Sequence, residues 1–220
     1  MSIKDHIRNI SISASKLNNH IDYLTQLKEK GFEPRVIYDI GSCVLEWTNQ
    51  AKRIWPNARY ILFDAFEPTQ FLYEEGDYDY HIGVLSDVND KTVRFYQNDI
   101  YPTGNSYYME IGCPLKLFDE NNYIEKKTTT LDTVVKNRGF PLPDLIKIDV
   151  QGSELDVIKG AQMCLKHASE LIVEMQHDDY NKGAPKVDET RPYIESLGWK
   201  CVAPLYNNNG PDGDYGFTRV

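Results

Sequence analysis

Four short apolar runs, separated by segments with helical spacing, constrain the fold of this chain more than any other feature of its 220 residues. The runs are "RVIYDI", "RYILFD", "LIKIDV" and "LIVEMQ". Their apolar residues are nearly continuous, which is typical of parallel strands that helices cover on both faces. Strands that alternate with helices form a doubly wound sheet with right-handed crossovers. The sequence therefore predicts an α/β fold with a doubly wound, mostly parallel sheet.

The segments around these runs complete the predicted order of elements. The expected helices cover residues 44–56, 69–75, 153–168 and 188–198, the further strands cover 78–85, 91–98, 199–205 and 213–220, and residues 126–139 form a strand that runs into a helix. Residues 99–127 mix Pro, Gly and Asn with aromatic residues and show no sustained period, so we expect a long functional loop or insertion there. Residues 1–34 are interpreted as a helical N-terminal extension and residues 35–220 as the main domain.

Composition narrows the classes of function. The formal charge of −9 argues against a surface built for phosphate backbones, so we expect no nucleic-acid partner. No apolar run approaches the roughly 20 residues that span a bilayer, and the charged N-terminus "MSIKDHIRNI" argues against a signal peptide. The cysteines are far apart and form no CxxC pair, so they are expected to be buried thiols in a reducing compartment. These features predict a cytoplasmic protein with no membrane partner.

The carboxyl ends of the strands hold the candidate ligand-binding residues, because a doubly wound sheet binds its ligand at that edge. The first run ends in Asp39, Gly41 and Ser42. A glycine there lets the backbone approach a ligand, and a following helix offers free N–H groups. The stretch lacks the GxGxxG spacing of a dinucleotide site, because Cys43 and Leu45 stand where further glycines would lie. A tight turn with an exposed Asp39 is the alternative interpretation.

The next two strand ends also carry polar residues. Asp64 or Glu67 could accept hydrogen bonds from a ribose diol, although their spacing should not direct both side chains at one point. Glu67 could instead favour the start of the following helix, and Asp64 could pair with a neighbouring group. Ser86 and Asp87 could reach an adenine edge, or could simply form a polar turn.

The last two apolar runs bring more carboxylates and a histidine to the same edge. Asp149 ends one run and Glu154 begins the next helix, so both are expected to line the same cleft as Asp39. The last run carries Glu174 and is followed by His177. A metal could use Asp149, Glu174 and His177, but no tight ligand spacing supports this, and we predict no metal site. His177 could act as a general base, or it could be a hydrogen-bonded structural group.

Taken together, these motifs resemble the FkbM-type methyltransferases, a branch of the S-adenosylmethionine-dependent enzymes with the Rossmann-like class I methyltransferase fold. The motifs are "VIYDIGSC", "FDAFEP", "GVLSD", the "GNSYY" loop and "LIKIDVQGSELDVIKGA". The last is the most specific, because it joins a strand, an Asp, a Gly-containing turn, a Glu and an amphipathic helix. The resemblance implies a seven-stranded sheet whose last strand is antiparallel, and S-adenosyl-L-methionine as the cofactor.

The resemblance also implies roles for individual residues. The implied cofactor-binding residues follow the first three strands: Asp39, Gly41, Ser42, Asp64, Glu67, Ser86 and Asp87. Among them, Glu67 would hold the ribose hydroxyls, with Asp64 as the alternative. Asp149 would stand beside the transferring methyl group, with Gln151 and Glu154 on the turn beneath it.

O-methylation of a glycan sugar or of another small hydroxylated metabolite is the leading expectation for function. Asn105, Ser106 and Tyr107 belong to a loop whose amide, hydroxyl and aromatic groups suit a sugar ring, and the same mixture suits an ordinary surface loop. Asp149 is the first candidate to take the acceptor proton and His177 the second. A nucleic-acid methyltransferase and a catalytically inactive cofactor-binding or assembly module remain as alternatives, and a nicotinamide-dependent oxidoreductase has the least support.

Two residues depart from the pattern of the family. Leu45 stands where relatives usually have a glycine, and Gln151 stands where they often have a glutamate. The first departure bears on the fit of the cofactor, and the second on any role that needs a charge in that turn. Both also keep the inactive-module alternative open.

Overall fold

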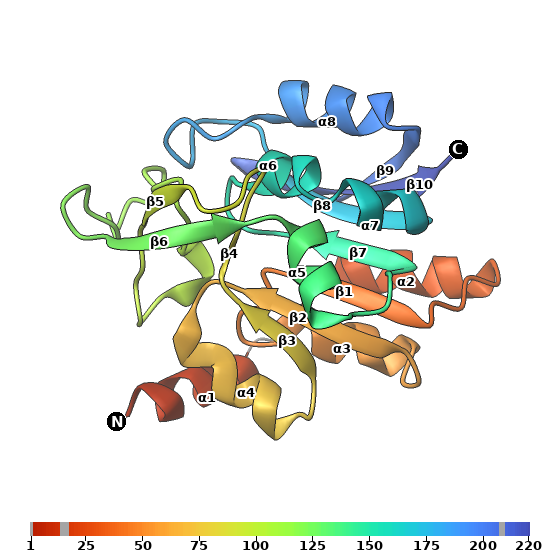
Figure 1. The fold of residues 1–220 in the computed structure, drawn as a ribbon, viewed down its shortest axis with the longest axis horizontal. Helices are drawn as coiled ribbons and strands as arrows, with labels where there is room; N and C mark the ends of the chain where they lie inside the picture. The colour runs from red at the N-terminus through yellow and green to blue at the C-terminus, as the bar shows by residue number, and fades with distance from the viewer. Residues whose placement is uncertain (1, 14–17, 207–209) are drawn as a thin grey trace.

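A computed structural model describes residues 2–13, 18–206 and 210–220 and shows a seven-stranded sheet in the order β3-β2-β1-β7-β8-β10-β9 (Figure 1). The strands are β1 (Val36–Ile40), β2 (Arg59–Asp64), β3 (Asp79–Ile82), β7 (Leu145–Ile148), β8 (Glu170–Gln176), β9 (Trp199–Tyr206) and β10 (Asp212–Arg219). Strands β3, β2, β1, β7 and β8 pair in parallel, whereas β10 is antiparallel to both β8 and β9. The predicted doubly wound sheet with an antiparallel last strand is confirmed.

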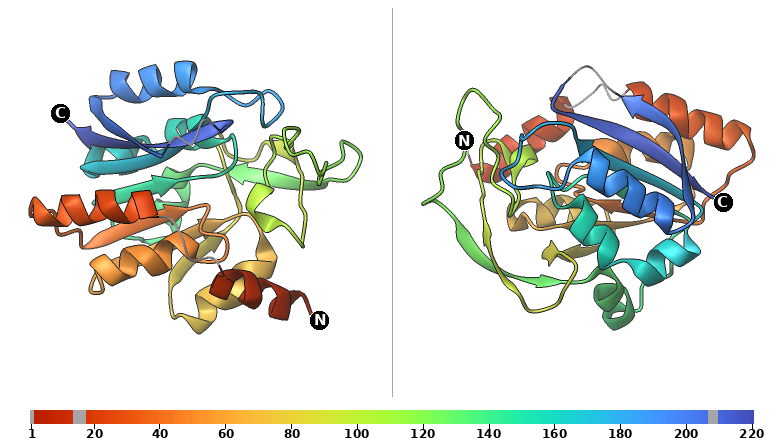
Figure 2. Two further views of the ribbon diagram at one scale, coloured as in Figure 1. Left: turned by 180° about the vertical axis from the view of Figure 1, so that it is seen from behind. Right: turned by 90° about the horizontal axis from the view of Figure 1, so that it is seen from above.

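Helices cover both faces of this sheet, as Figure 2 shows. One face carries α2 (Asn18–Glu29), α3 (Glu46–Ile54) and α4 (Gln70–Glu75), and the other carries α5 (Leu131–Arg138), α6 (Glu154–Lys159), α7 (Gln162–His167) and α8 (Val187–Ser196). Each face has its own apolar core. Trp47 and Ala51 of α3 pack on Ile37 and Leu62 on the first face, and Val157 of α6 packs on the strands from the second. Burial on both faces explains why these strands are apolar without alternation.

The N-terminal region forms two helices, α1 (Ile3–Ser13) and α2. Leu24 and Leu27 of α2 belong to the same apolar cluster as Ile37 of strand β1. Ile7 of α1 is fully buried and packs against Val44 and Phe66, which lie in the turns that follow β1 and β2. The N-terminal helices therefore contact both the sheet and its ligand-binding edge.

A second, three-stranded sheet stands beside the large one and has the order β4-β6-β5. Its strands are β4 (Val84–Leu85), β5 (Thr92–Phe95) and β6 (Ile124–Thr129). The predicted strand over residues 78–85 was wrong in its continuity, because it breaks at Gly83 into β3 and β4, and β4 leaves the large sheet to pair with β6. The segment between β5 and β6 contains a short 3-10 turn, η2 (Pro102–Gly104), and β6 begins within the predicted loop.

The predicted helix over residues 153–168 is also interrupted, at Gly160 and Ala161, which separate α6 from α7. A Cβ atom at Gly160 would lie 2.2 Å from the backbone oxygen of Ser86, so two backbones come into close contact there. The carboxylate of Asp132 accepts hydrogen bonds from the N–H groups of Met163 and Cys164. This carboxylate satisfies free N–H groups at the start of α7, which makes a new helix start possible.

Two further expectations can be compared with the structure. Cys164 is buried, but Cys43, Cys113 and Cys201 are only half-buried, so the expectation of four buried thiols was wrong for those three. Cys43 and Cys113 lie in loops and Cys201 on the edge strand β9, where side chains have fewer neighbours.

No helix among the described residues is long and apolar enough to cross a membrane.

Candidate active site

A cleft opens at the carboxyl ends of β1, β2 and β7 and encloses about 950 Å³ of empty space, counting its open mouth. The cleft is lined by several of the residues that the sequence singled out: Gly41, Ser42, Asp64, Asn105, Ser106, Tyr107, Asp149 and Gln151. The ligand-binding edge of the sheet and the cleft therefore coincide.

The turn after β1 forms one wall of the cleft and depends on Gly41. Its φ is +79°, and a Cβ atom there would lie 1.7 Å from the backbone oxygen of Asp149. Both the conformation and the close contact require glycine. Leu45 also has a left-handed conformation, with φ 68° and ψ 19°, so a leucine occupies a position whose geometry favours glycine. Ser42 donates a hydrogen bond to Tyr73 at 3.0 Å, which ties the turn to α4.

Asp39 lies beneath the cleft, where its side chain is fully buried. Thr48 donates a hydrogen bond to Asp39 Oδ2 at 2.5 Å, and Nζ of Lys147 lies 3.1 Å from Oδ1. Lys147 also donates to the backbone oxygen of Gly41 at 3.0 Å. Asp39 is thus not on the cleft surface, and it supports the turn through Lys147.

Lys147 is a site residue that the sequence reasoning missed. It projects from the middle of the apolar strand β7, lines the cleft and is 4% exposed. Burial alone would lower the pKa of its ammonium, but the carboxylates of Asp39 and Asp149 outweigh this and raise that pKa above its usual value. A lysine inside an otherwise apolar run was the available signal, because a buried cation needs a buried carboxylate.

Asp149 stands at the end of β7 on the cleft surface. Its Oδ2 lies 3.5 Å from Nζ of Lys147, and its Oδ1 accepts a hydrogen bond from Nε2 of Gln151 at 2.8 Å. Burial tends to raise the pKa of this carboxyl, but the charge of Lys147 and hydrogen bonds from Gln151 and Glu174 hold the pKa below its ordinary value. Asp149 is therefore an ionised carboxylate in the cleft.

Glu154 lies at the start of α6 and is only 3% exposed. Its Oε1 accepts hydrogen bonds from the N–H groups of Val150 at 2.9 Å and Gly152 at 3.1 Å. Burial raises the pKa of its carboxyl to about 7. Glu154 is not among the residues that line the cleft, and its contacts order the turn that carries Asp149.

Asp64, which ends β2, and Glu67, which follows it, have different surroundings. Asp64 lines the cleft and accepts hydrogen bonds from the N–H groups of Cys43 and Phe66 at 2.7 and 2.8 Å, and burial raises the pKa of its carboxyl. Glu67 is exposed and lines a separate groove, together with Lys4 and Lys126. In this conformation Asp64 reaches the cleft and Glu67 does not.

The loop after β5 closes one side of the cleft, and Ser86 contacts this loop from behind. Ser86 is buried, donates a hydrogen bond to Asp87 at 3.1 Å and lies 3.2 Å from the hydroxyl of Tyr107. Tyr107 and Tyr108 both donate to Oδ2 of Asp156 on α6, at 2.8 and 2.9 Å. Asp156 was not predicted as a site residue. It holds residues 101–113, here called the tyrosine loop, against the cleft through these two hydrogen bonds. Ser86 and Asp87 lie behind Tyr107 and do not line the cleft.

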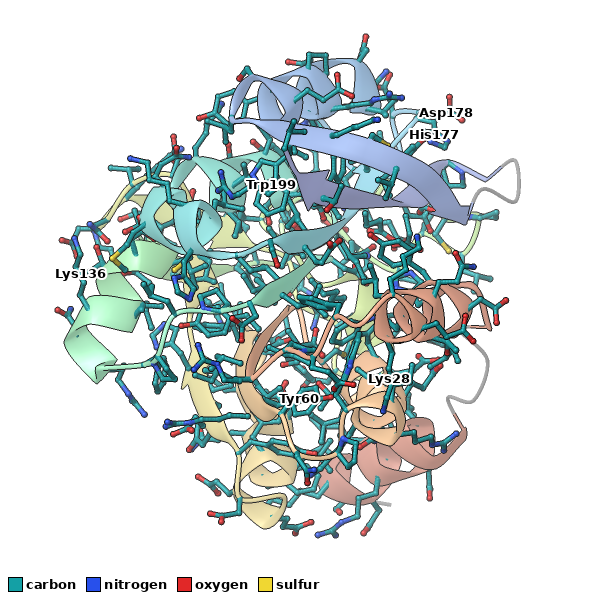
Figure 3. All side chains as sticks on the ribbon, turned by 90° about the vertical axis from the view of Figure 1, so that its right-hand side faces the viewer. Lys28, Tyr60, Lys136, His177, Asp178 and Trp199 are labelled. Atoms are coloured by element: carbon teal, nitrogen blue, oxygen red, sulfur yellow. The ribbon has the colours of Figure 1, made fainter. Side chains whose placement is uncertain are left out.

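His177 lies away from the cleft, beyond the end of β8 (Figure 3). Its Nε2 is 2.8 Å from the hydroxyl of Tyr215, and its backbone N–H donates to the carbonyl of Pro211. These contacts join the end of β8 to β10. Within the described part of the chain, no three His, Cys, Asp or Glu side chains are placed to hold a metal ion.

Comparison with known proteins identifies the family. Residues 38–201 match the methyltransferase FkbM domain, which covers most of the chain. The chain belongs to the FkbM methyltransferase family. The resemblance of the sequence motifs is thereby confirmed, and the protein is a methyltransferase. Membership of the FkbM family implies S-adenosylmethionine as the methyl donor.

Solved structures with the same fold are distant in sequence. The crystal structure of a putative O-methyltransferase from Klebsiella pneumoniae aligns over 100% of this FkbM chain and 90% of its own, with a TM-score of 0.54 and 12% identity. The O-methyltransferase TomG from Streptomyces achromogenes, solved in complex with SAM, aligns over 99% and 87%, with a TM-score of 0.52 and 13% identity. These similarities confirm the class I methyltransferase fold.

One curated relative is similar over a short stretch. The hexuronic acid methyltransferase AglP of Haloferax volcanii is 39% identical over 49 residues, which are 22% of this FkbM chain and 20% of AglP. The chain thus matches about a fifth of that relative.

The residues of the cleft fit the cofactor that the family implies. A sulfonium is cationic and a ribose is polyhydroxylated, and the cleft presents the carboxylates of Asp64 and Asp149. Val84, Leu85 and Phe95 give an apolar wall that suits a purine ring. Nδ2 of Asn105, which lines the cleft, is buried and meets no hydrogen-bond partner in the described ranges 2–13, 18–206 and 210–220. A donor of this kind fits a bound ligand with an acceptor atom.

Proposed function

We propose that this FkbM methyltransferase transfers a methyl group from S-adenosylmethionine to a hydroxyl oxygen of a glycan sugar or of another small hydroxylated metabolite. The observation that carries the proposal is the environment of Asp149. An ionised carboxylate on the surface of the cleft, held 3.5 Å from a buried lysine, is an acceptor for the proton of an alcohol.

The cofactor supplies an activated methyl group on a sulfonium, so the protein has to align the acceptor and exclude water. The acceptor oxygen forms a bond to the methyl carbon as the carbon–sulfur bond breaks, and the electron pair of that bond stays on sulfur. Asp149 receives the hydroxyl proton. Lys147 and Gln151 hold the Asp149 carboxylate in place through its two oxygens. His177 is the weaker candidate for the proton acceptor, because it lies outside the cleft and contacts Tyr215.

Three observations support a hydroxylated acceptor. The loop with Asn105, Ser106 and Tyr107 lines the cleft and offers the amide, hydroxyl and aromatic groups that suit a sugar. The short stretch of similarity to AglP, a hexuronic acid methyltransferase, agrees with a sugar acceptor. The formal charge of −9 weighs against a nucleic-acid acceptor.

Calorimetry with S-adenosylhomocysteine and transfer of a labelled methyl group test the proposal. We expect binding of S-adenosylhomocysteine, and label transfer to at least one member of a panel of neutral hexosides, hexuronides and small alcohols. Asp149→Asn should keep the binding and lower transfer on the order of 10²–10⁴-fold, as loss of a general base does. Failure to bind at millimolar concentrations would contradict the proposed cofactor, and unchanged transfer by Asp149→Asn would contradict its role.

A further inference from the structure

Two carboxyl groups meet at the ends of the neighbouring strands β7 and β8, and one amide joins them. Nε2 of Gln151 donates to Oδ1 of Asp149 at 2.8 Å and to Oε2 of Glu174 at 2.9 Å. An amide nitrogen carries two hydrogens and accepts none, so each hydrogen serves one carboxyl group. Gln151 has a φ of 56°, which a residue with a side chain adopts only at a cost. The surrounding structure thus holds the amide of Gln151 between the two acids.

The charges around the pair are unequal. Asp149 has the ammonium of Lys147 at 3.5 Å from its own strand β7, and His20 of α2 is a further basic side chain that favours its ionised form. The charges that act most strongly on Glu174 are acids: Asp149, Asp214 and Asp212 from β10, and Glu154 from α6. Lys147 also interacts with Glu174, but less strongly than with Asp39 and Asp149, and Tyr180 is a further titratable neighbour. The imidazole of His20 is already engaged with Asp214, since its Nε2 lies 2.9 Å from Oδ2 of that residue.

Asp149 and Glu174 are both only partly exposed and share one amide donor. Neighbouring carboxyl groups in such a site are disfavoured from being ionised together, because like charges repel where the dielectric is low. The proton therefore resides on the group with the less favourable surroundings, which is Glu174. Burial and the charge of Asp149, followed by that of Asp214, raise the pKa of the Glu174 carboxyl well above its ordinary value, in contrast to the lowered pKa of Asp149.

We propose that Gln151 and Glu174 are positioning residues for Asp149: the Gln151 amide orients the Asp149 carboxylate, and Glu174 carries a proton, so that no second negative charge stands beside it. This inference rests on the proposed function, in which Asp149 receives the acceptor proton. It gives the neutral amide of Gln151 a role at a position where relatives often have a glutamate. A carboxylate at that position would add a third negative charge and would draw the proton toward Asp149.

Nuclear magnetic resonance of the side-chain carboxyl carbons tests the pair without any acceptor. The protein is labelled at the Asp and Glu carboxyl groups and titrated, and signals are assigned by their loss in Asp149→Asn, Glu174→Gln and Glu154→Gln. We expect the Glu174 signal to report a protonated group at pH 6, and the Asp149 signal an ionised one. Glu29→Gln, on the exposed side of α2, is the matched control and should leave both signals unchanged. Ionised Glu174 at pH 6 would overturn the inference.

Variants that keep the shape of the side chains separate charge from packing. Glu174→Gln places a neutral carboxamide where the neutral acid stood, so we expect the titration of Asp149 to move by less than about half a pH unit. Gln151→Glu should move the titration of Asp149 upward by about one unit or more, since one unit corresponds to only about 1.4 kcal/mol. An unchanged titration of Asp149 in Gln151→Glu would also overturn the inference.

Methyl transfer measured against pH then links the pair to the reaction. The rate of methyl transfer at low pH should follow the titration of Asp149. In Gln151→Glu the rate should therefore be lower than in the native protein at low pH and should recover as the pH rises. The Kd of this variant for S-adenosylhomocysteine should be unchanged. An equal loss at every pH in both Gln151→Glu and Glu174→Gln would indicate a structural role only and would overturn the inference. If the titrations agree but the native protein transfers no methyl group to any acceptor, the proposed function fails and the carboxyl pair stands.

Discussion

Nζ of Lys147 lies 3.1 Å from Oδ1 of Asp39, and both side chains are at most 5% exposed. A buried ion pair of this kind connects the middle of β7 to the end of β1, directly below the cleft. Nζ of Lys147 also lies 3.5 Å from Asp149, so this buried ammonium forms ion pairs with two carboxylates. Asp39 is buried below the cleft, and Asp149 lies on the cleft surface.

Lys147→Met should destabilise the protein strongly. The variant leaves the Asp39 carboxylate buried without its cation, and breaking a buried pair from one side typically costs about 3–5 kcal/mol. Denaturant unfolding gives the free energy of unfolding. The double variant Lys147→Met/Asp39→Asn should recover part of the loss, because it removes the uncompensated charge. A loss below about 1 kcal/mol, as for an exposed pair, would contradict the importance of this contact.

The protein should be more stable with glycine at position 45 than with alanine there. Both variants lose the buried leucine side chain, but only alanine keeps a Cβ atom in the left-handed conformation, which costs about 1–2 kcal/mol. We therefore expect Leu45→Gly to unfold at a free energy about 1 kcal/mol higher than Leu45→Ala. The buried Leu62 on β2 is the control, because there glycine should be the less stable of the two. The same order at both positions would argue against backbone strain at Leu45.

The stability of the protein should fall as the pH rises from about 5 to 8, in part through Glu154. Its carboxyl has a pKa of about 7 in the folded state, above the ordinary value of 4.5. The folded state therefore binds more protons than the unfolded state between these values, and the stabilisation is lost as the pH rises through 7. The loss is on the order of 3 kcal/mol if the pKa reverts fully on unfolding.

Glu154→Gln tests this pH dependence. The amide oxygen can accept both hydrogen bonds from Val150 and Gly152, so the turn should keep its structure. Urea unfolding at pH 5 and pH 8 should show a smaller difference in this variant than in the native protein. The surface variant Glu29→Gln should retain the full difference, and an equal difference in Glu154→Gln would show that Glu154 titrates normally.

Asp156 should control the mobility of the tyrosine loop. Asp156→Ala removes the acceptor of both the Tyr107 and Tyr108 hydroxyls, which leaves two half-buried donors without their partner. Hydrogen exchange should become faster in residues 101–113, and S-adenosylhomocysteine should bind more weakly. Tyr108→Phe removes a single bond and should cost about 1 kcal/mol. Unchanged exchange in Asp156→Ala would show that other contacts hold the loop.

The periodicity of the sequence predicted the large sheet because each buried strand has a continuous apolar run. The breaks at Gly83 and Gly160 were not predicted, since each depends on contacts between residues distant in the sequence. Gly160 meets the backbone of Ser86, which lies 74 positions earlier in the chain. An isolated glycine in a periodic segment signals a break only when its partner is known.

The site was predicted in outline, because the strand ends supply its residues. Asp149 and Gly41 were found from position alone, whereas the opposite surroundings of Asp64 and Glu67 depend on how the turn after β2 closes on Cys43 and Phe66. Lys147 escaped notice although it interrupts an apolar run, because its partner Asp39 is identified only once β1 and β7 are known to be neighbours. The contact of Glu67 with the ribose hydroxyls stays a prediction.

The missing side chain of Gly41 has an evolutionary consequence. The turn that carries this glycine and the turn that carries Asp149 come from segments over a hundred residues apart, yet their backbones are in direct contact. Neither turn can be lengthened, shortened or exchanged with that of another enzyme without displacing the other. In a chimera between two related methyltransferases, both turns would therefore have to come from the same parent.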